Sequence, residues 1–204
     1  MNADTGRTGV VVAGGRSSRF AGADKALARL EGTPLIRHVV DDLAPAVDEV
    51  VVNCRGAQRD ALEAALSGFE VRFAEDRIHD RGPLAGVRSG LRAARGKYAA
   101  LVACDMPHVP ASLLSALFEH ARHRTGAAPR VDEVLQPFPA VVHVRAGLDA
   151  CREAFTRHPR SMREFLDSLD PVAVPERVVG AFVTPDAFAN VNTRADLRAA
   201  TERR

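Results

Sequence analysis

Residues 8–25 read TGVVVAGGRSSRFAGADK, and this stretch decides the fold. Its first six residues form a short apolar run with three consecutive valines. Such a run is typical of a strand that is buried on both faces of a parallel sheet. The run ends at Gly14 and Gly15, which let the backbone turn sharply after the strand. We therefore expect a buried strand that ends in a glycine loop.

Strand and helix patterns alternate along the rest of the chain. Further strands are predicted at 47–53, 69–74, 98–104 and 140–144. Helices are predicted at 34–43, 58–66, 84–94, 110–122, 149–155, 162–169 and 193–201. This alternation favours βαβ units, and right-handed crossovers place helices on both faces of the sheet. We therefore expect a three-layer α/β/α sandwich with a Rossmann-like, mainly parallel sheet, in a single domain that spans residues 1–204.

Two helix starts carry residues that commonly cap helices. Thr33 precedes Pro34, so we expect Thr33 to be the N-cap and Pro34 the first helical residue of the 34–43 helix. Thr193 is expected to cap the last helix, with Asp196 three residues further on.

The composition fits an ordinary folded domain. Hydrophobic residues make up 46% of the chain and charged residues 26%. The 28 Lys and Arg against 26 Asp and Glu are interspersed, so we expect neither nucleic acid nor a membrane as a partner. No apolar stretch approaches the roughly 20 residues of a transmembrane helix, and we see no secretory signal. Cys54, Cys104 and Cys151 lack metal-type spacing, which favours a reduced, cytoplasmic protein.

The glycine loop carries features of a phosphate site. A glycine pair after a buried strand can present backbone N–H groups to phosphate, and Arg16, Arg19 and Lys25 add three cations. Lysine is a rare choice in this chain, which has 26 Arg among its 28 basic residues, and its compact ammonium suits a phosphate. The loop matches neither the P-loop nor the dinucleotide-binding pattern. A basic surface loop without a ligand is the alternative.

Asp105 directly follows the strand predicted at 98–104. A carboxylate at this edge can hold Mg²⁺ while phosphate and water complete the coordination. The alternative is an ordinary turn before Pro107. Because ligands in such folds bind beyond the carboxyl ends of the strands, Asp105, Asn53 and the glycine loop are expected to share one crevice.

Seven sequence blocks, in order along nearly the whole chain, resemble the molybdenum cofactor guanylyltransferases, the MobA proteins of the nucleotidyltransferase superfamily. The blocks are VAGGRSSRF with DK at 24–25, GTPLIRHV from 32, VVVN at 50–53, ED at 75–76, GPLAG at 82–86, CDMPHVP at 104–110 and NVNT at 190–193. The chain departs from the pattern at Ala21, where a glycine is expected. The resemblance implies a nucleotide-diphospho-sugar transferase-like fold, with nucleotide binding in residues 8–110 and acceptor binding beyond them.

The resemblance also implies an activity and its site. It implies Mg²⁺-dependent transfer of GMP from GTP to the phosphate of Mo-molybdopterin, with Arg19, Lys25 and Asp105 as the catalytic residues. Asp105 is the implied metal ligand, and Asn190 and Asn192 are implied at the acceptor. Nucleotide binding is implied for Val12, Ala13, Gly14, Gly15, Lys25, Asn53, Asp76, Gly82 and Asp105.

The implied partners are GTP, Mo-molybdopterin, and molybdoenzyme apoproteins or their chaperones. Three alternatives stay open at this point. They are a cytidylyltransferase for the same cofactor, a nucleotidyltransferase for a sugar or alcohol phosphate, and a non-catalytic nucleotide-binding adaptor. An adaptor has no need for the metal-binding carboxylate of Asp105. Whether residues 136–140 contact the acceptor is also open.

Overall fold

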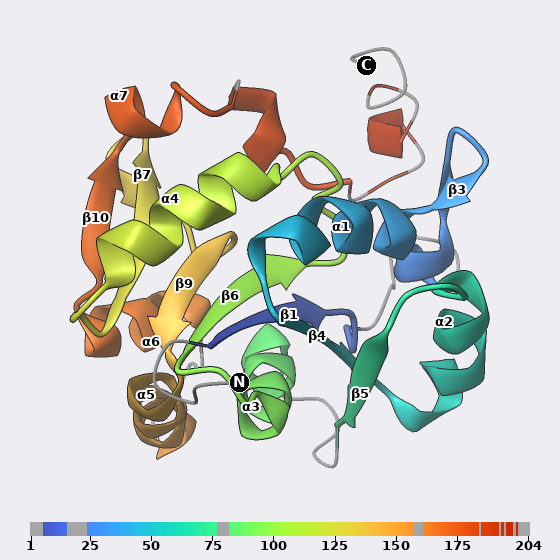
Figure 1. Ribbon diagram of the computed structural model, residues 1–204, viewed down its shortest axis with the longest axis horizontal. Coiled ribbons are helices and arrows are strands. Elements are labelled where there is room, and N and C mark those ends of the chain that lie inside the picture. The colour runs from blue at the N-terminus through green and yellow to red at the C-terminus, as the bar shows by residue number, and fades with distance from the viewer. Residues whose placement is uncertain are drawn as a thin grey trace.

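The structure is a computed structural model in which a central sheet is covered by helices on both faces (Figure 1). It describes residues 6–15, 24–76, 82–156, 161–183, 185–191, 193, 195–197 and 199. Within these residues the main sheet has eight strands, in the order β10-β7-β9-β6-β1-β4-β5, with β8 paired to β7. The predicted α/β/α class is confirmed.

The sheet is mainly parallel. β1 lies between β4 and β6 and runs parallel to both, and β4 is parallel to β5. β9 runs antiparallel to β6 and β7, whereas β10 is parallel to β7. The strands are β1 Arg7–Val12, β4 Glu49–Cys54, β5 Val71–Glu75, β6 Tyr98–Ala103, β7 Gly126–Val131, β8 Val134–Leu135, β9 Ala140–His143 and β10 Val172–Pro175.

Successive residues of β1 contribute to two different cores. Val11 belongs to the core beneath α1, α2, α4 and α7, whereas Val10 and Val12 belong to the core beneath α3, α5 and α6. All three valines are buried, which explains the uninterrupted apolar run. The helices are α1 Leu35–Leu43, α2 Arg59–Ala65, α3 Pro83–Ala93, α4 Ala111–Ala121, α5 Val144–Thr156, α6 Met162–Leu169 and α7 Glu176–Val179.

The start of α1 differs from the prediction. Glu31 and Gly32 have positive φ angles of 51° and 81°, and they form the turn of a small hairpin. Its strands are β2 (Arg29–Leu30) and β3 (Thr33–Pro34). Pro34 has a ψ of 140° and is therefore the N-cap of α1, which starts at Leu35. The prediction that Thr33 caps the helix was wrong because strand pairing holds Thr33 and Pro34 in extended conformations.

Several elements of the second half were missed or misplaced. The strands β7, β8 and β10 and the short helix α7 were not predicted, and α5 begins five residues before the predicted start at residue 149. Thr193 and Asp196 do exchange the expected capping hydrogen bonds, at 3.1 and 2.8 Å. None of the described helices is long and apolar enough to cross a membrane.

The register of the sheet brings three strand ends together. Val12, at the end of β1, is paired with Asn53 of β4 and with Ala103 of β6. Gly14, Asn53 and Asp105 therefore lie at one edge of the sheet. This is the edge at which the crevice is expected.

Candidate active site

Asn53 ties the glycine loop to the end of β5. Its side chain is fully buried, and its Oδ1 accepts a hydrogen bond from the Gly14 amide at 3.2 Å. Its Nδ2 donates to the Ala74 carbonyl at 3.2 Å and to Asp76 Oδ1 at 2.8 Å. The amide of Asn53 thus positions Gly14 and Asp76. A direct contact between Asn53 and a nucleotide stays a prediction.

Two glycines leave room for the Asn53 side chain. A Cβ atom on Gly14 would lie 2.5 Å from Asp76 Oδ2 and 2.9 Å from Asn53 Oδ1. A Cβ atom on Gly86, in the first turns of α3, would overlap Asn53 Oδ1. Any side chain at either position would therefore displace the amide. Gly82 is the N-cap of α3, with a φ of 67°, and Pro83 occupies the first helical position.

Lys25 and Asp105 form an ion pair at this edge of the sheet. Their side chains are 16% and 14% exposed, so most of the pair is out of contact with water. Lys25 begins the 3₁₀ helix η2 (Lys25–Leu27), and Asp24 caps this helix by accepting a hydrogen bond from the Ala26 amide at 3.1 Å. Asp24, the residue before Lys25, thus fixes the backbone conformation of the turn that carries Lys25.

Gln58 is a site residue that sequence reasoning missed. Gln58 is 4% exposed and is the last residue of the 3₁₀ helix η4 (Gly56–Gln58). Its Nε2 donates to the Ala13 carbonyl at 3.2 Å and to Asp24 Oδ2, and its Oε1 accepts from the Arg55 amide at 2.9 Å. In the sequence Gln58 looked like an ordinary helix-start residue. A polar side chain next to the Arg55–Gly56 turn was the only signal, and it is weak.

Asn190 lies on a segment that is attached to Asp105. The amide of Val191 donates to the Asp105 carbonyl at 2.9 Å, and the Val191 side chain is buried against Leu30 and Leu35. Asn190 itself is exposed beside this attachment. The structure therefore brings Asn190 to the same side of the crevice as Asp105. The predicted residues Arg19 and Asn192 lie outside the described residues.

The donor set suits a magnesium ion that keeps ligands from the substrate. Among the described residues, no group of three or more His, Cys, Asp or Glu side chains could enclose a metal. Asp105 offers a carboxylate at the open edge of the sheet. Mg²⁺ is commonly held by one or two carboxylates together with substrate phosphates and water. The residues present fit that mode of binding and not a closed metal site.

The thiol next to Asp105 is not a nucleophile. Burial raises the pKa of Cys104, and the nearby Asp105 carboxylate raises it further. Burial likewise raises the pKa of Cys54 to about 11. Both thiols are therefore protonated at neutral pH, whereas a reactive cysteine requires the thiolate.

Comparison with known proteins identifies the family. The family model described as the MobA-like NTP transferase domain matches residues 9–172. A protein of Haloferax mediterranei named "Probable molybdenum cofactor guanylyltransferase" is 48% identical over 203 residues, covering 100% of this chain and 97% of that protein. A protein of Natronomonas pharaonis with the same name is 40% identical over 197 residues, covering 97% of this chain and 98% of that protein.

A solved structure agrees with these matches. The molybdopterin-guanine dinucleotide biosynthesis protein A of Archaeoglobus fulgidus superposes with a TM-score of 0.78 and 26% sequence identity. The match covers 96% of this chain and 97% of that one. The structural match and the family match both cover most of the chain, and they agree on the family. The chain belongs to the MobA-like NTP transferase domain family.

Proposed function

We propose that this protein transfers GMP from GTP to the terminal phosphate of Mo-molybdopterin, which yields the guanine dinucleotide cofactor and pyrophosphate. The observation that carries the chemistry is the Lys25–Asp105 pair beside the glycine loop, at the carboxyl edge of the sheet. The two relatives named guanylyltransferases support guanine as the base and the molybdenum cofactor as the acceptor.

The reaction needs no covalent enzyme intermediate. An oxygen of the acceptor phosphate attacks the α-phosphorus of GTP, and the bond from that phosphorus to the bridging oxygen of the β-phosphate breaks. Pyrophosphate leaves with that oxygen and its electrons. Because the attacking phosphate is already anionic, no general base is required. The protein contributes alignment and charge stabilisation.

The chain's own residues divide this work. The Lys25 ammonium, together with Arg19, is suited to hold the leaving pyrophosphate. The N–H group of Gly14 already donates a hydrogen bond to Asn53. Gly15 is exposed, so its N–H group is the one suited to donate to phosphate. Mg²⁺ held by Asp105 would supply positive charge against the phosphate oxygens. Asn190 would contact the acceptor, because its segment is attached to Asp105.

Three further proposals accompany the activity. Transfer depends on Mg²⁺, the protein acts in the cytoplasm, and molybdoenzyme apoproteins or their chaperones receive the product. The three cysteines of the described chain are buried free thiols, which supports a reducing compartment.

Nucleotide preference tests the proposal most directly. Binding of GTP, CTP, ATP and UTP to the purified protein is measured by calorimetry, with and without Mg²⁺. We expect GTP to bind at least about tenfold more tightly than the other three, and only with Mg²⁺ present. A preference for CTP would replace the proposal with a cytidylyltransferase that uses the same residues. Binding of GTP without pyrophosphate release in the presence of Mo-molybdopterin would point to an adaptor.

A further inference from the structure

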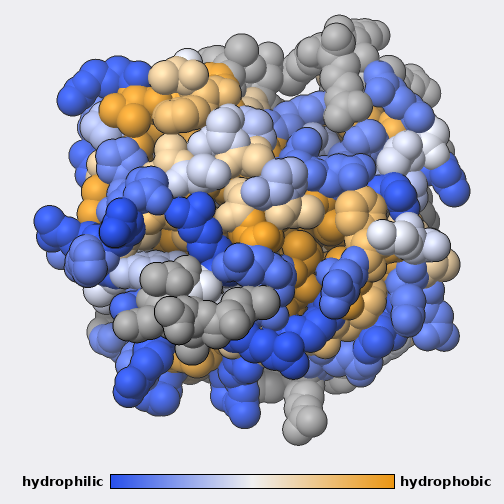
Figure 2. All heavy atoms as spheres, in the orientation of Figure 1, coloured by the Kyte–Doolittle hydropathy of each residue, from blue (hydrophilic) through white to orange (hydrophobic). Residues whose placement is uncertain are grey.

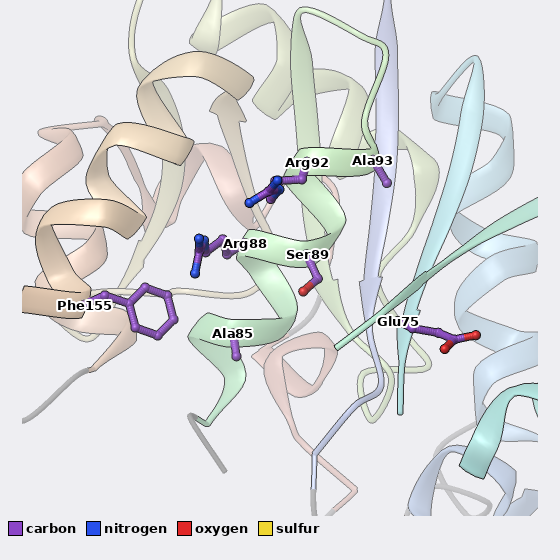
Figure 3. Close-up of a pocket in the computed structure, with 7 residues that line it drawn as sticks. All are labelled: Glu75, Ala85, Arg88, Ser89, Arg92, Ala93 and Phe155. Carbon is purple, nitrogen blue, oxygen red and sulfur yellow. The ribbon is translucent and has the colours of Figure 1, made fainter. Parts of the chain in front are cut away.

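A groove lined by arginines lies outside the crevice, between α3 and α5. Arg88 and Arg92 of α3, Arg152 of α5 and the apolar side chains of Leu148 and Phe155 line a hollow of about 350 Å³. A neighbouring hollow of about 420 Å³ shares Arg88, Arg92 and Phe155 and continues to Ala85 and to Glu75, the last residue of β5 (Figure 3). We call these two hollows together the arginine groove.

The sequence of α3 explains why its arginines face outward. A Cβ atom on Gly90 would overlap Val10 of β1, and one on Gly86 would overlap Asn53, so both glycines face the sheet. Arg88 and Arg92 each follow one of these glycines by two residues, which is about 200° around an α-helix. Their side chains therefore point away from the sheet. Figure 3 shows both guanidinium groups on the side of α3 that faces Phe155, with Glu75 on the other side.

The charge of the groove is not neutralised from within the described structure. Arg88 and Arg92 form no ion pair with a carboxylate of the described residues. Arg152 pairs with Asp149 at 2.9 Å, and both of those side chains are more than half exposed. The groove is thus lined by three guanidinium groups and by one carboxylate, that of Glu75, which pairs with Arg59 of α2 at 3.5 Å. Arginines that share a hollow repel each other unless an anion lies between them.

Arg88 is held in place before any partner arrives. Its guanidinium lies over the Phe155 ring, 5.4 Å from the ring centroid. Burial raises the pKa of the Cys151 thiol of α5 to about 12, and the Arg88 charge acts in the opposite direction, which places that charge close to α5. Stacking on an aromatic face restrains the flexible stem and leaves the edge of the guanidinium free to donate hydrogen bonds.

The groove lacks the parts of a small-phosphate site. Such sites commonly use backbone N–H groups at a helix N-terminus, and the N-terminus of α3 lies at Gly82 and Pro83, next to the crevice. The amides in the middle of α3 are bonded within the helix. What the groove offers is arginine and aromatic side chains in an open hollow, which is the composition of protein–protein hot spots.

We propose that the arginine groove docks an acidic segment of a partner protein. Arg88 and Arg92 stand one helical turn apart, about 5–6 Å along α3, which suits two carboxylates with that separation. An apolar side chain between those carboxylates would contact Leu148 and Phe155. This inference does not depend on the proposed reaction, because none of these residues belongs to the crevice.

The test is a peptide-binding measurement on the full chain. The probe is a fluorescein-labelled helical peptide with two Glu residues four positions apart and a Leu between them, and its control carries Gln in place of Glu. We expect the Glu peptide to bind about tenfold more tightly than the Gln peptide, by fluorescence anisotropy at low salt. The double variant Arg88→Glu/Arg92→Glu should lose that preference. A second variant, Arg88→Gln/Arg92→Gln, should lose it without adding negative charge.

A matched variant controls for net charge. Arg122→Glu/Arg124→Glu makes the same charge change on the opposite layer, at the exposed turn after α4, and should bind the Glu peptide like the unchanged protein. Equal loss in the control variant would overturn the proposal, since attraction would then be general. Calorimetry with inorganic triphosphate tests whether the groove binds small anions instead. Triphosphate binding that disappears with Arg88 and Arg92 and is tighter than peptide binding would make the groove a small-anion site and would also overturn the proposal.

Discussion

The ion pair between Lys25 and Asp105 has two roles that can be separated. In the free protein each charge compensates the other in a mostly buried position. During the proposed transfer, Asp105 would hold the metal and Lys25 the phosphates. Removal of either charge should therefore affect both stability and activity, whereas removal of both should affect activity alone.

Asp105→Asn and Lys25→Ala should each reduce turnover by a factor of about 100 or more. Each should also lower the free energy of unfolding by about 1–3 kcal/mol, because each removes the mostly buried Lys25–Asp105 ion pair. The double variant Lys25→Met/Asp105→Asn should recover most of that stability and none of the turnover. Pyrophosphate release and urea unfolding measure the two effects. Near-normal kcat/KM in Asp105→Asn would remove Asp105 from the proposed metal site.

Gln58 acts at the same scale, through other residues. It connects the end of β1, the Arg55 turn and Asp24, and Asp24 in turn caps the helix that begins with Lys25. Its place in a buried network could not be found in the sequence, because the partners lie 34 and 45 positions away along the chain.

Gln58→Leu should misplace Lys25 and should not abolish the site. The change leaves the Ala13 carbonyl and the Arg55 amide without their partner, which costs about 1–3 kcal/mol of stability. We expect kcat to fall more than KM rises, since Lys25 is proposed to act on the leaving group. Steady-state kinetics on the folded variant provides the readout, with Arg59→Leu as a neighbouring control. An unchanged kcat would limit Gln58 to a structural role.

At the scale of elements, α3 shows how one helix serves the core and the site. Its buried face carries Gly86 against Asn53 and, one turn later, Gly90 against Val10. Both glycines permit close approach to the sheet. Only the first of them touches a residue at the crevice.

This difference gives a matched pair of variants. Gly86→Ala and Gly90→Ala should each destabilise the protein by about 1–3 kcal/mol through overpacking. Gly86→Ala should also raise the KM for the nucleotide, because the new methyl group displaces Asn53 and, with it, Asp76 and Gly14. Gly90→Ala should leave that KM unchanged. If both variants changed the KM equally, the Asn53 network would not be what positions the nucleotide site.

The elements that sequence predicted well share a physical origin. β1, β4 and β6 are central strands, so both faces are buried and their apolar runs are unbroken. β7 and β10 were missed because Gly126–Val131 includes a proline and Val172–Pro175 is a short strand at the edge of the sheet. The β2–β3 hairpin was hidden because Pro34 suits the start of a helix as well as an extended residue. Strand pairing, which is not local in sequence, decided between the two.

The site was predicted to the extent that it lies at strand ends. Gly14, Asn53 and Asp105 come together because parallel strands in register end at one edge. The contacts that organise the site, from Asn53 to Asp76 and from Gln58 to Asp24, cross between elements. Sequence patterns describe single elements and do not show which side chain of one element reaches the next.

At the scale of the whole molecule, the two halves share one sheet and one set of cores. β6 of the first half pairs with β9 of the second, and β9 with β7. The core beneath α1 and α4 contains Val11 and Val52 as well as Val141 and Val174. In the space-filling view, apolar residues gather over α7 and hydrophilic ones cover much of the lower half, near α3 and α5 (Figure 2). Because the two halves share this sheet and this core, we expect the nucleotide-binding and acceptor-binding parts to fold together.

A single cooperative transition should follow from this shared core. Circular dichroism at 222 nm reports helices of both halves, and the near-ultraviolet signal of Tyr98, the one tyrosine, reports the β6–β9 junction. We expect both signals to change at the same urea concentration. A fragment that ends at residue 122 should not fold, because it leaves the β9 side of β6 unpaired and exposes the apolar face of α4 that packs on β7 and β9. Separate transitions, or a folded fragment, would show that the nucleotide-binding half is a domain of its own.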